Sequence, residues 1–191
     1  MTFTCADLQE LGSLVAAGWR EAADRDWSVR AGSLDWSCAV TADHTVDTVF
    51  APALFLASRK QDAYPAYGFT TPGAQAHPLL LAEALQTAVR VVVAVVSAAP
   101  PGVRAIIWQR PKVEARGPSD FAARAGLELI LHAHDVCTGL GVEFRPPEPL
   151  CDRLRQHTRS WPHWHSAGWT SLTMIGDAWP DLLRSSGRSM V

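Results

Sequence analysis

A carboxylate and an imidazole one helical turn apart are the residues of this sequence best suited to chemistry. They are Glu128 and His132, in an apolar segment that reads ELILH. Positions i and i+4 of a helix lie on one face, so both side chains could share one divalent ion. A pair of this spacing is often a solvated ion pair instead. The segment is apolar enough to be largely buried, however, and buried charges need partners.

Two ligands on one helix do not complete a metal site, so a third must come from another helix. His44, in the segment TADHTVD, is the best candidate. Two histidines and one glutamate with an open fourth position form a known catalytic zinc site, and the same donors suit other first-row metals. The sequence therefore predicts a metal site of His44, Glu128 and His132, with zinc as the first choice and nickel as the alternative.

Two aspartates are placed to orient the histidines. Asp135 follows His132 by three residues, and Asp47 follows His44 by three residues. A carboxylate beside the second ring nitrogen of a ligand histidine fixes its tautomer and orientation. We favour this role for Asp135, whereas for Asp47 an exposed position is an equal alternative.

Arg124 and His134 lie on the same predicted helix as the Glu128–His132 pair. Arg124 precedes Glu128 by one turn and could bind a substrate carboxylate through a bidentate pair. The alternative for Arg124 is a structural ion pair with Glu128. His134 lies about 200° around the helix from His132, so we expect packing or a hydrogen bond there and no metal contact.

Other residues with chemical potential have simpler explanations. Trp36, just before the predicted ligand helix, is expected to anchor the core rather than stack on a substrate. Cys38 is expected to be a buried structural thiol rather than a neighbour of the metal. His163 and His165 lie in the segment WPHWH, where we expect aromatic packing in a loop.

Helical periodicity and end signals predict four long helices, which make a bundle the economical architecture. A shorter helix is expected near 148–160, and another within DAWPDLLRSSGR. The run Val91-Val-Val-Ala-Val-Val could form a buried strand, but its helical lead-in favours a helix. The four long helices are expected at Thr4–Asp24, Thr41–Lys60 (with Pro52 inside it), Pro78–Ala99 and Ser119–Leu140, with Ser119 as a helix cap and Gly141 ending the last helix.

Two stretches between the helices are less regular. Residues 103–108 are predicted as a short strand or a loop. Residues 61–77 form a connection too long for a simple turn, and it contains Tyr64, Tyr67 and His77. Connections of this length often have a function, so this one is a candidate cover for the pocket.

Composition narrows the class of protein. The chain has 191 residues, 48% of them hydrophobic, and a net charge of −2 with scattered basic residues. These values favour a folded domain and argue against a nucleic-acid surface. The N-terminus lacks signal-peptide features, and the most apolar stretch contains charged residues, so we expect a cytoplasmic protein with no membrane span and free cysteines.

Three segments together resemble the DinB-like helical superfamily: LDWSCAVTADHTVD, ELILHAHDV and DAWPDLLRSSGR. Within it, the chain is most similar to the N-terminal domain of mycothiol-dependent maleylpyruvate isomerases and its actinobacterial relatives. The likeness extends from Leu8 to Arg188. It implies an all-α fold in which residues 1–191 form a single DinB-like four-helix bundle with a short Trp-rich C-terminal extension. That tail offers apolar surface for a homodimer, unless it folds back on the bundle.

In that group a Trp-containing turn leads into a helix with a ligand histidine, and a later helix has the pattern Glu-x-x-x-His-x-x-Asp. The resemblance thus implies His44, Glu128 and His132 as ligands, with Asp135 completing the pattern. The isomerases are longer and have an additional C-terminal domain, so the stand-alone thiol S-transferases look more similar to this chain.

The resemblance implies a metal-dependent transferase with mycothiol as co-substrate. A metal-activated thiolate would attack an electrophilic small molecule. The alternatives are a thiol-dependent isomerase, a metal-dependent hydrolase, and a non-catalytic bundle that binds a metal or a small molecule. Only the resemblance points to mycothiol, because the sequence contains no visible thiol-recognition motif.

Overall fold

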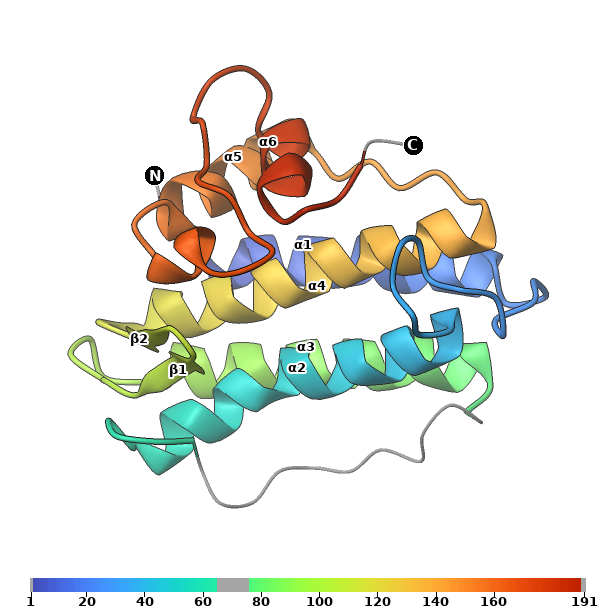
Figure 1. The fold of residues 1–191 in the computed structure, drawn as a ribbon. Coiled ribbons are helices and arrows are strands. Elements are labelled where there is room, and N and C mark those ends of the chain that lie inside the picture. The colour runs from blue at the N-terminus through green and yellow to red at the C-terminus, as the bar shows by residue number, and fades with distance from the viewer. Residues whose placement is uncertain (1, 65–75, 190–191) are drawn as a thin grey trace.

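The computed structural model describes residues 2–64 and 76–189, and these residues are mostly helical (Figure 1). Helices α1 and α4 run in one direction and α2 and α3 in the other. Helix α2 packs against α3 and α4, and α1 packs against the same two helices to close a four-helix bundle. The all-α prediction is therefore confirmed as a mostly helical fold. The bundle helices are α1 (Cys5–Glu21), α2 (Cys38–Ser58), α3 (Pro78–Ser97) and α4 (Pro118–Leu140).

The helix ends follow local chemistry, which corrects two predicted boundaries. Helix α2 begins three residues earlier than predicted, because the Ser37 hydroxyl accepts a hydrogen bond from the Val40 amide and caps it. Ser119 does not cap α4; the helix begins at Pro118, since proline is suited to the first helical position. The prediction for Gly141 is confirmed: it ends α4 in the left-handed conformation, at φ 66°.

The valine-rich run 91–96 lies in helix α3, so the helical prediction is confirmed. Leu85 and Val92 are fully buried on the inner face of α3, which contacts α1 and α2. Within the described residues, α3 is the one helix that is long and apolar enough to cross a membrane. Of its most apolar 18-residue stretch, 39% is buried inside the protein. A single such helix is weak evidence, because core helices have the same properties, and the absence of a membrane span stays a prediction.

A small antiparallel hairpin follows the bundle's third helix. Its strands are β1 (Ile106–Gln109) and β2 (Lys112–Glu114). Of the stretch 103–108, predicted as a strand or a loop, residues 106–108 lie in strand β1 and residues 103–105 do not. The strand β2 was not predicted, because three residues are too few for a period-two pattern. The Ile106 amide donates to the Lys60 carbonyl at 2.8 Å, which ties the hairpin to the end of α2.

The C-terminal segment folds over the α1–α4 side of the bundle (Figure 1). It contains α5 (Glu148–Thr158), the 3-10 turn η1 (Pro162–His165) and α6 (Ala178–Ser185). The fully buried Asp181 carboxylate accepts hydrogen bonds from the amides of Thr173 and Met174. Buried carboxylates need such donors, so Asp181 fixes the loop that precedes α6.

The tryptophans of this segment mostly face inward. Trp161, Trp164 and Trp179 are buried, and Trp169 is partly buried against the core. The tail therefore packs back on the bundle, which is one of the two alternatives predicted for its apolar surface. A homodimer stays a prediction.

The seam between α2 and α4 sets the position of the first predicted ligand. Gly139 allows the Arg30 carbonyl and the Cys38 sulfur to approach α4; a Cβ there would lie 2.2 Å and 2.5 Å from these atoms. The Cys38 thiol donates to the Val136 carbonyl at 3.5 Å. Because Cys38 is the first residue of α2, these contacts fix the end of the helix on which His44 lies.

We expect Gly139→Ala to lower the free energy of unfolding by about 2 kcal/mol or more, since a methyl group there must displace backbone. The matched control is Gly18→Ala in α1, where a Cβ meets nothing within 4 Å. Alanine's higher helix propensity should stabilise that variant by about 0.5–1 kcal/mol. Urea unfolding of both variants tests this, and equal midpoints would contradict the close α2–α4 contact.

Candidate metal centre

Helices α2 and α4 bring His44, Glu128 and His132 together, each of them half-buried. One ligand atom from each residue lies within 4.8 Å of the other two. The His132 Nε2 atom is 3.2 Å from Glu128 Oε2, and the rings of His44 and His132 meet edge to face at 5.2 Å. The three residues that the sequence singled out thus form one cluster that could hold a metal ion.

Glu128 has its charge divided between two partners. The Arg124 guanidinium donates to one carboxylate oxygen, and His132 faces the other. Burial by itself would raise the pKa of Glu128, but the charge of Arg124 and the contacts with His132 hold it well below its usual range. Glu128 is therefore a carboxylate at neutral pH, as a metal ligand must be.

His132 lies between two carboxylates. Its Nδ1 is 3.1 Å from Asp135 Oδ2, and its Nε2 faces Glu128. Burial by itself would lower the pKa of His132, but hydrogen bonds and charges from Asp135 and Glu128 raise it to about 9. Both ring nitrogens of His132 thus face carboxylates, and a cation bound here would take the place of the Nε2 proton.

Asp135 is in turn held by the C-terminal segment. Arg188 donates from Nε to Asp135 Oδ1 at 2.8 Å and from its terminal nitrogen to Oδ2 at 2.7 Å. The fork of a guanidinium fixes a carboxylate in one orientation. The predicted orienting geometry of Asp135 is present, and Arg188 adds a contact that the sequence analysis missed, because 53 residues separate the partners.

His44 presents its ring to His132 on one side and to Trp36 on the other. Burial, helped by the positive charge of His132, lowers the pKa of His44. The Trp36 ring packs edge to face on His44 at 4.9 Å and is 45% exposed. The prediction that Trp36 anchors the core is therefore wrong: the turn before α2 holds the ring at the surface, against the imidazole.

Arg124 uses its donors inside the protein. Its Nε donates to the Ile107 carbonyl at 3.0 Å, and its guanidinium lies 4.1 Å from the centroid of the Trp108 ring. With the bond to Glu128, these contacts match the ion-pair alternative for Arg124. A role in binding a substrate carboxylate stays a prediction.

The ring of His163 packs on Trp108, the same ring that the Arg124 guanidinium contacts. It lies parallel to Trp108 at 4.6 Å and is fully buried, and neither nitrogen has a hydrogen-bond partner among residues 2–64 and 76–189. Trp164 and Trp169 enclose it further. Burial and the Arg124 charge lower the pKa of His163 to about 3, so the ring is neutral. The predicted aromatic packing is present, and it reaches the metal cluster through Trp108 and Arg124.

The remaining candidates lie outside the cluster. His134 Nε2 donates to the Ser189 carbonyl at 3.1 Å, and its ring packs on Trp179, as its predicted direction requires. Asp47 is half-buried, and among the described residues no hydrogen bond joins it to His44. Burial, with the nearby Asp43 charge, raises the pKa of Asp47.

The predictions for Cys38 and for the connection 61–77 can be compared with the structure only where their residues are described. Cys38 is free and buried, as expected, and burial raises its pKa to about 11. The Tyr64 hydroxyl accepts from the Gln109 amide, and His77 caps α3. Tyr67 lies outside the described residues, so the proposed pocket cover is not tested there.

The cluster fits a four-coordinate divalent ion. Two ligands of a tetrahedral zinc ion, each about 2.1 Å from it, are about 3.4 Å apart. Donor atoms within 4.8 Å of one another therefore need only small side-chain movements to meet one ion. Within the described residues the group has three members, which leaves a coordination position for water or a substrate.

No family model matches the chain, and no curated protein or solved structure matches it significantly. The arrangement of side chains is therefore the basis for any functional conclusion.

We expect Asp135→Asn to weaken zinc binding about 10- to 100-fold, because the amide orients His132 less well than the carboxylate does. Arg188→Gln should give a smaller loss in the same direction. Competition with a chromophoric chelator measures both affinities. Asp35→Asn is the control, because it removes an exposed carboxylate paired with Arg30. Unchanged affinity in Asp135→Asn, with a lowered unfolding midpoint, would make the aspartate purely structural.

We expect His163→Phe to leave the protein at least as stable as wild type at pH 7, since it replaces a buried ring without polar partners. The folded-state pKa of about 3 lies below the ordinary value of 6.5. Below pH 6.5 the unfolded chain therefore binds a proton that the folded chain does not, and wild-type stability falls by at most about 1.4 kcal/mol per pH unit. The variant should lose less stability in acid than wild type.

Denaturant unfolding at pH 7 and pH 5 measures the difference. His165→Phe is the matched control because His165 is exposed, and it should stay within about 0.5 kcal/mol of wild type at both pH values. A His163→Phe variant with the wild-type pH dependence would show that His163 is protonated in the folded protein.

Proposed function

We propose that this protein is a metal-dependent transferase in which a low-molecular-weight thiol attacks an electrophilic small molecule. The convergence of His44, Glu128 and His132 from two helices is the observation that carries the proposal. Two imidazoles and a carboxylate match the protein ligands of known catalytic zinc sites, with a fourth position for a reactant. Zinc is the first candidate metal and nickel the second.

The charges around the cluster support a cation there. Asp135 accepts from Nδ1 of His132, so that Nε2 faces Glu128 and is directed into the cluster. Arg124 binds one oxygen of Glu128, and the other oxygen faces His132 Nε2, so a metal that replaces the Nε2 proton would bind both atoms. The lowered pKa of His44 keeps its ring neutral and able to donate a lone pair.

The protein residues would position the reactants and exclude water. A divalent cation in the site would supply the charge that stabilises a thiolate at neutral pH. Trp36, exposed beside His44, offers a ring face to the apolar part of an electrophile. The Arg124 stack keeps Glu128 ionised and fixed, so that the ligand does not move during the reaction.

The finer assignment depends on the sequence resemblance. The bundle, the ligand order along the chain and the Glu-x-x-x-His-x-x-Asp pattern match what the DinB-like superfamily would require. Mycothiol is the thiol implied by its transferase members. A thiol-dependent isomerase or a hydrolase could use the same ligands, with water replacing the thiol in the hydrolase.

We expect about one zinc or nickel ion per chain in the wild-type protein and less than about a tenth in His132→Ala, since two remaining ligands hold a metal weakly. Elemental analysis after purification without chelators measures this. His165→Ala removes an exposed histidine and is the control. A wild-type protein that contains no metal and is not stabilised by added zinc would refute the proposal.

The second step separates the enzyme classes. In the cobalt-substituted protein, mycothiol should produce a sulfur-to-cobalt charge-transfer band that is absent in His132→Ala. Thiol-dependent consumption of epoxide or haloalkane electrophiles would identify a transferase. Thiol-independent ester hydrolysis would identify a hydrolase instead. A bound metal with neither thiol binding nor turnover would leave a structural site and refute the transferase.

A further inference from the structure

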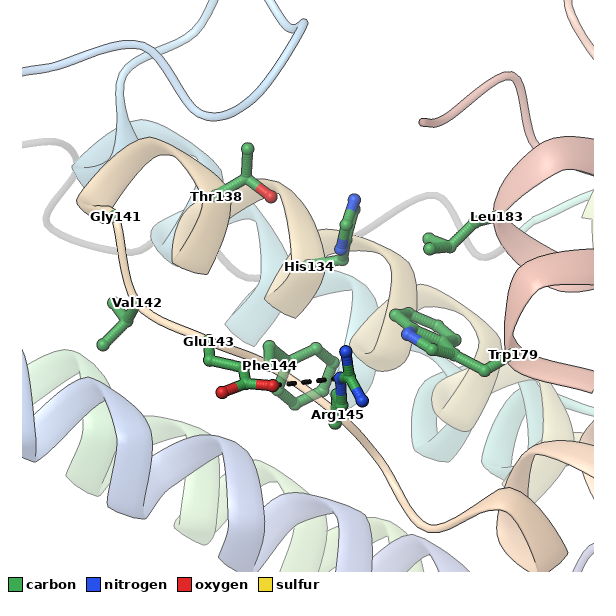
Figure 2. Close-up of a pocket in the computed structure, with 9 residues that line it drawn as sticks. All are labelled: His134, Thr138, Gly141, Val142, Glu143, Phe144, Arg145, Trp179 and Leu183. Atoms are coloured by element: carbon green, nitrogen blue, oxygen red, sulfur yellow. Dashed lines mark ion pairs between the residues drawn. The ribbon is translucent and has the colours of Figure 1, made fainter. Parts of the chain in front are cut away.

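A cavity lies on the side of α4 away from the cluster of His44, Glu128 and His132. It has a volume of about 330 Å³ and lies between the end of α4, residues 141–145 and helix α6 (Figure 2). Ligand sites have volumes of about 300–1,000 Å³, so this one suits a molecule with a single ring. His134 lines it, facing away from His132 on the same helix.

Aromatic and aliphatic side chains form the inner walls of this cavity. Trp179 and Leu183 extend from α6, and Phe144 comes from the loop after α4 (Figure 2). The rings of Phe144 and Trp179 meet edge to face at 5.8 Å, and Trp179 also meets His134 at 5.6 Å. Such walls bind an apolar group, and aromatic ring faces also attract cations.

Two features of the cavity attract positive charge, although the cationic side chain of Arg145 also lines it. Thr138 and Gly141, from the last turn and the cap of α4, line it, so the negative end of the helix dipole is near. No basic residue lies in that last turn. The Glu143 carboxylate is on the rim of the same cavity.

The chain itself already places a cation at this rim. Arg145 Nε is 2.9 Å from Glu143 Oε1, and both side chains are 77% exposed (Figure 2). Ion pairs this exposed contribute little to stability, so a ligand can displace the Arg145 group from Glu143 at small cost. A ligand inside the cavity would, in addition, contact the aromatic rings of Phe144 and Trp179.

We propose that this cavity is a binding site for a small organic cation, an ammonium group attached to one ring. The ring packs against the wall formed by Phe144, Trp179 and Leu183, and the ammonium lies toward Glu143 and the end of α4. This site shares no residue with the metal cluster, so it is independent of the proposed transferase activity.

Three ring compounds of one size but different charge test this: benzylamine, benzyl alcohol and benzoate, with benzyltrimethylammonium as a cation without N–H donors. We expect both cations to bind the purified protein with dissociation constants of about 1 mM or below, at least about fivefold tighter than the alcohol. Calorimetric titration measures the affinities. Benzoate should not bind.

Two variants locate the site. Glu143→Gln should weaken both cations about threefold or more, whereas Glu114→Gln, which removes the partner of Arg104 on the distant hairpin, should not. Thr138→Phe fills the cavity from the half-buried side of α4 and should abolish binding while leaving the unfolding midpoint near wild type. Equal binding of cation and alcohol, preferred binding of benzoate, or no binding would each overturn the proposal.

Discussion

The buried charge of Glu128 is the constraint on which the arrangement around α4 depends. A carboxylate in the bundle interior must be compensated, because an isolated buried charge costs several kcal/mol. Arg124 and His132, one turn to either side, each take one oxygen. The charges then alternate onward through Asp135 to Arg188, so each of the three inner groups lies between opposite charges. Removing one of these three would leave both its neighbours with less compensation.

The C-terminal segment supports this chain of charges from two directions. One support is the stack in which His163 and the Arg124 guanidinium lie on opposite faces of Trp108. The other is the bidentate bond from Arg188 to Asp135. The Trp-rich tail therefore does more than cover the bundle, because it holds the side chains that orient Glu128 and His132. A candidate metal site with ligands on two helices and supports from a separate segment is sensitive to how that segment folds.

Sequence reasoning could identify the cluster but not its supports. The ligand pair Glu128 and His132 follows from helical spacing, and long amphipathic runs predict the four helices. The position of Trp36 could not be predicted, since burial depends on how a turn directs a ring rather than on its apolarity. Arg188 was missed for another reason: a bond between residues 53 positions apart has no local pattern. The hairpin strand β2 was missed because three residues cannot display a period.

The unpartnered nitrogens of His163 bear on why the stack contains a histidine at all. A phenylalanine would fill the same space among the tryptophans without burying polar atoms, so stability alone does not favour the imidazole. Buried groups that lower stability are found preferentially at sites with a function. The ring of His163 is within electrostatic reach of Arg124 and Glu128. A neutral imidazole in this position supports the stack without adding a second positive charge beside Arg124, which a lysine or arginine would add. The structure does not explain why this ring is an imidazole, whose nitrogens have no partner among the described residues, but the charged cluster requires an uncharged ring at this position.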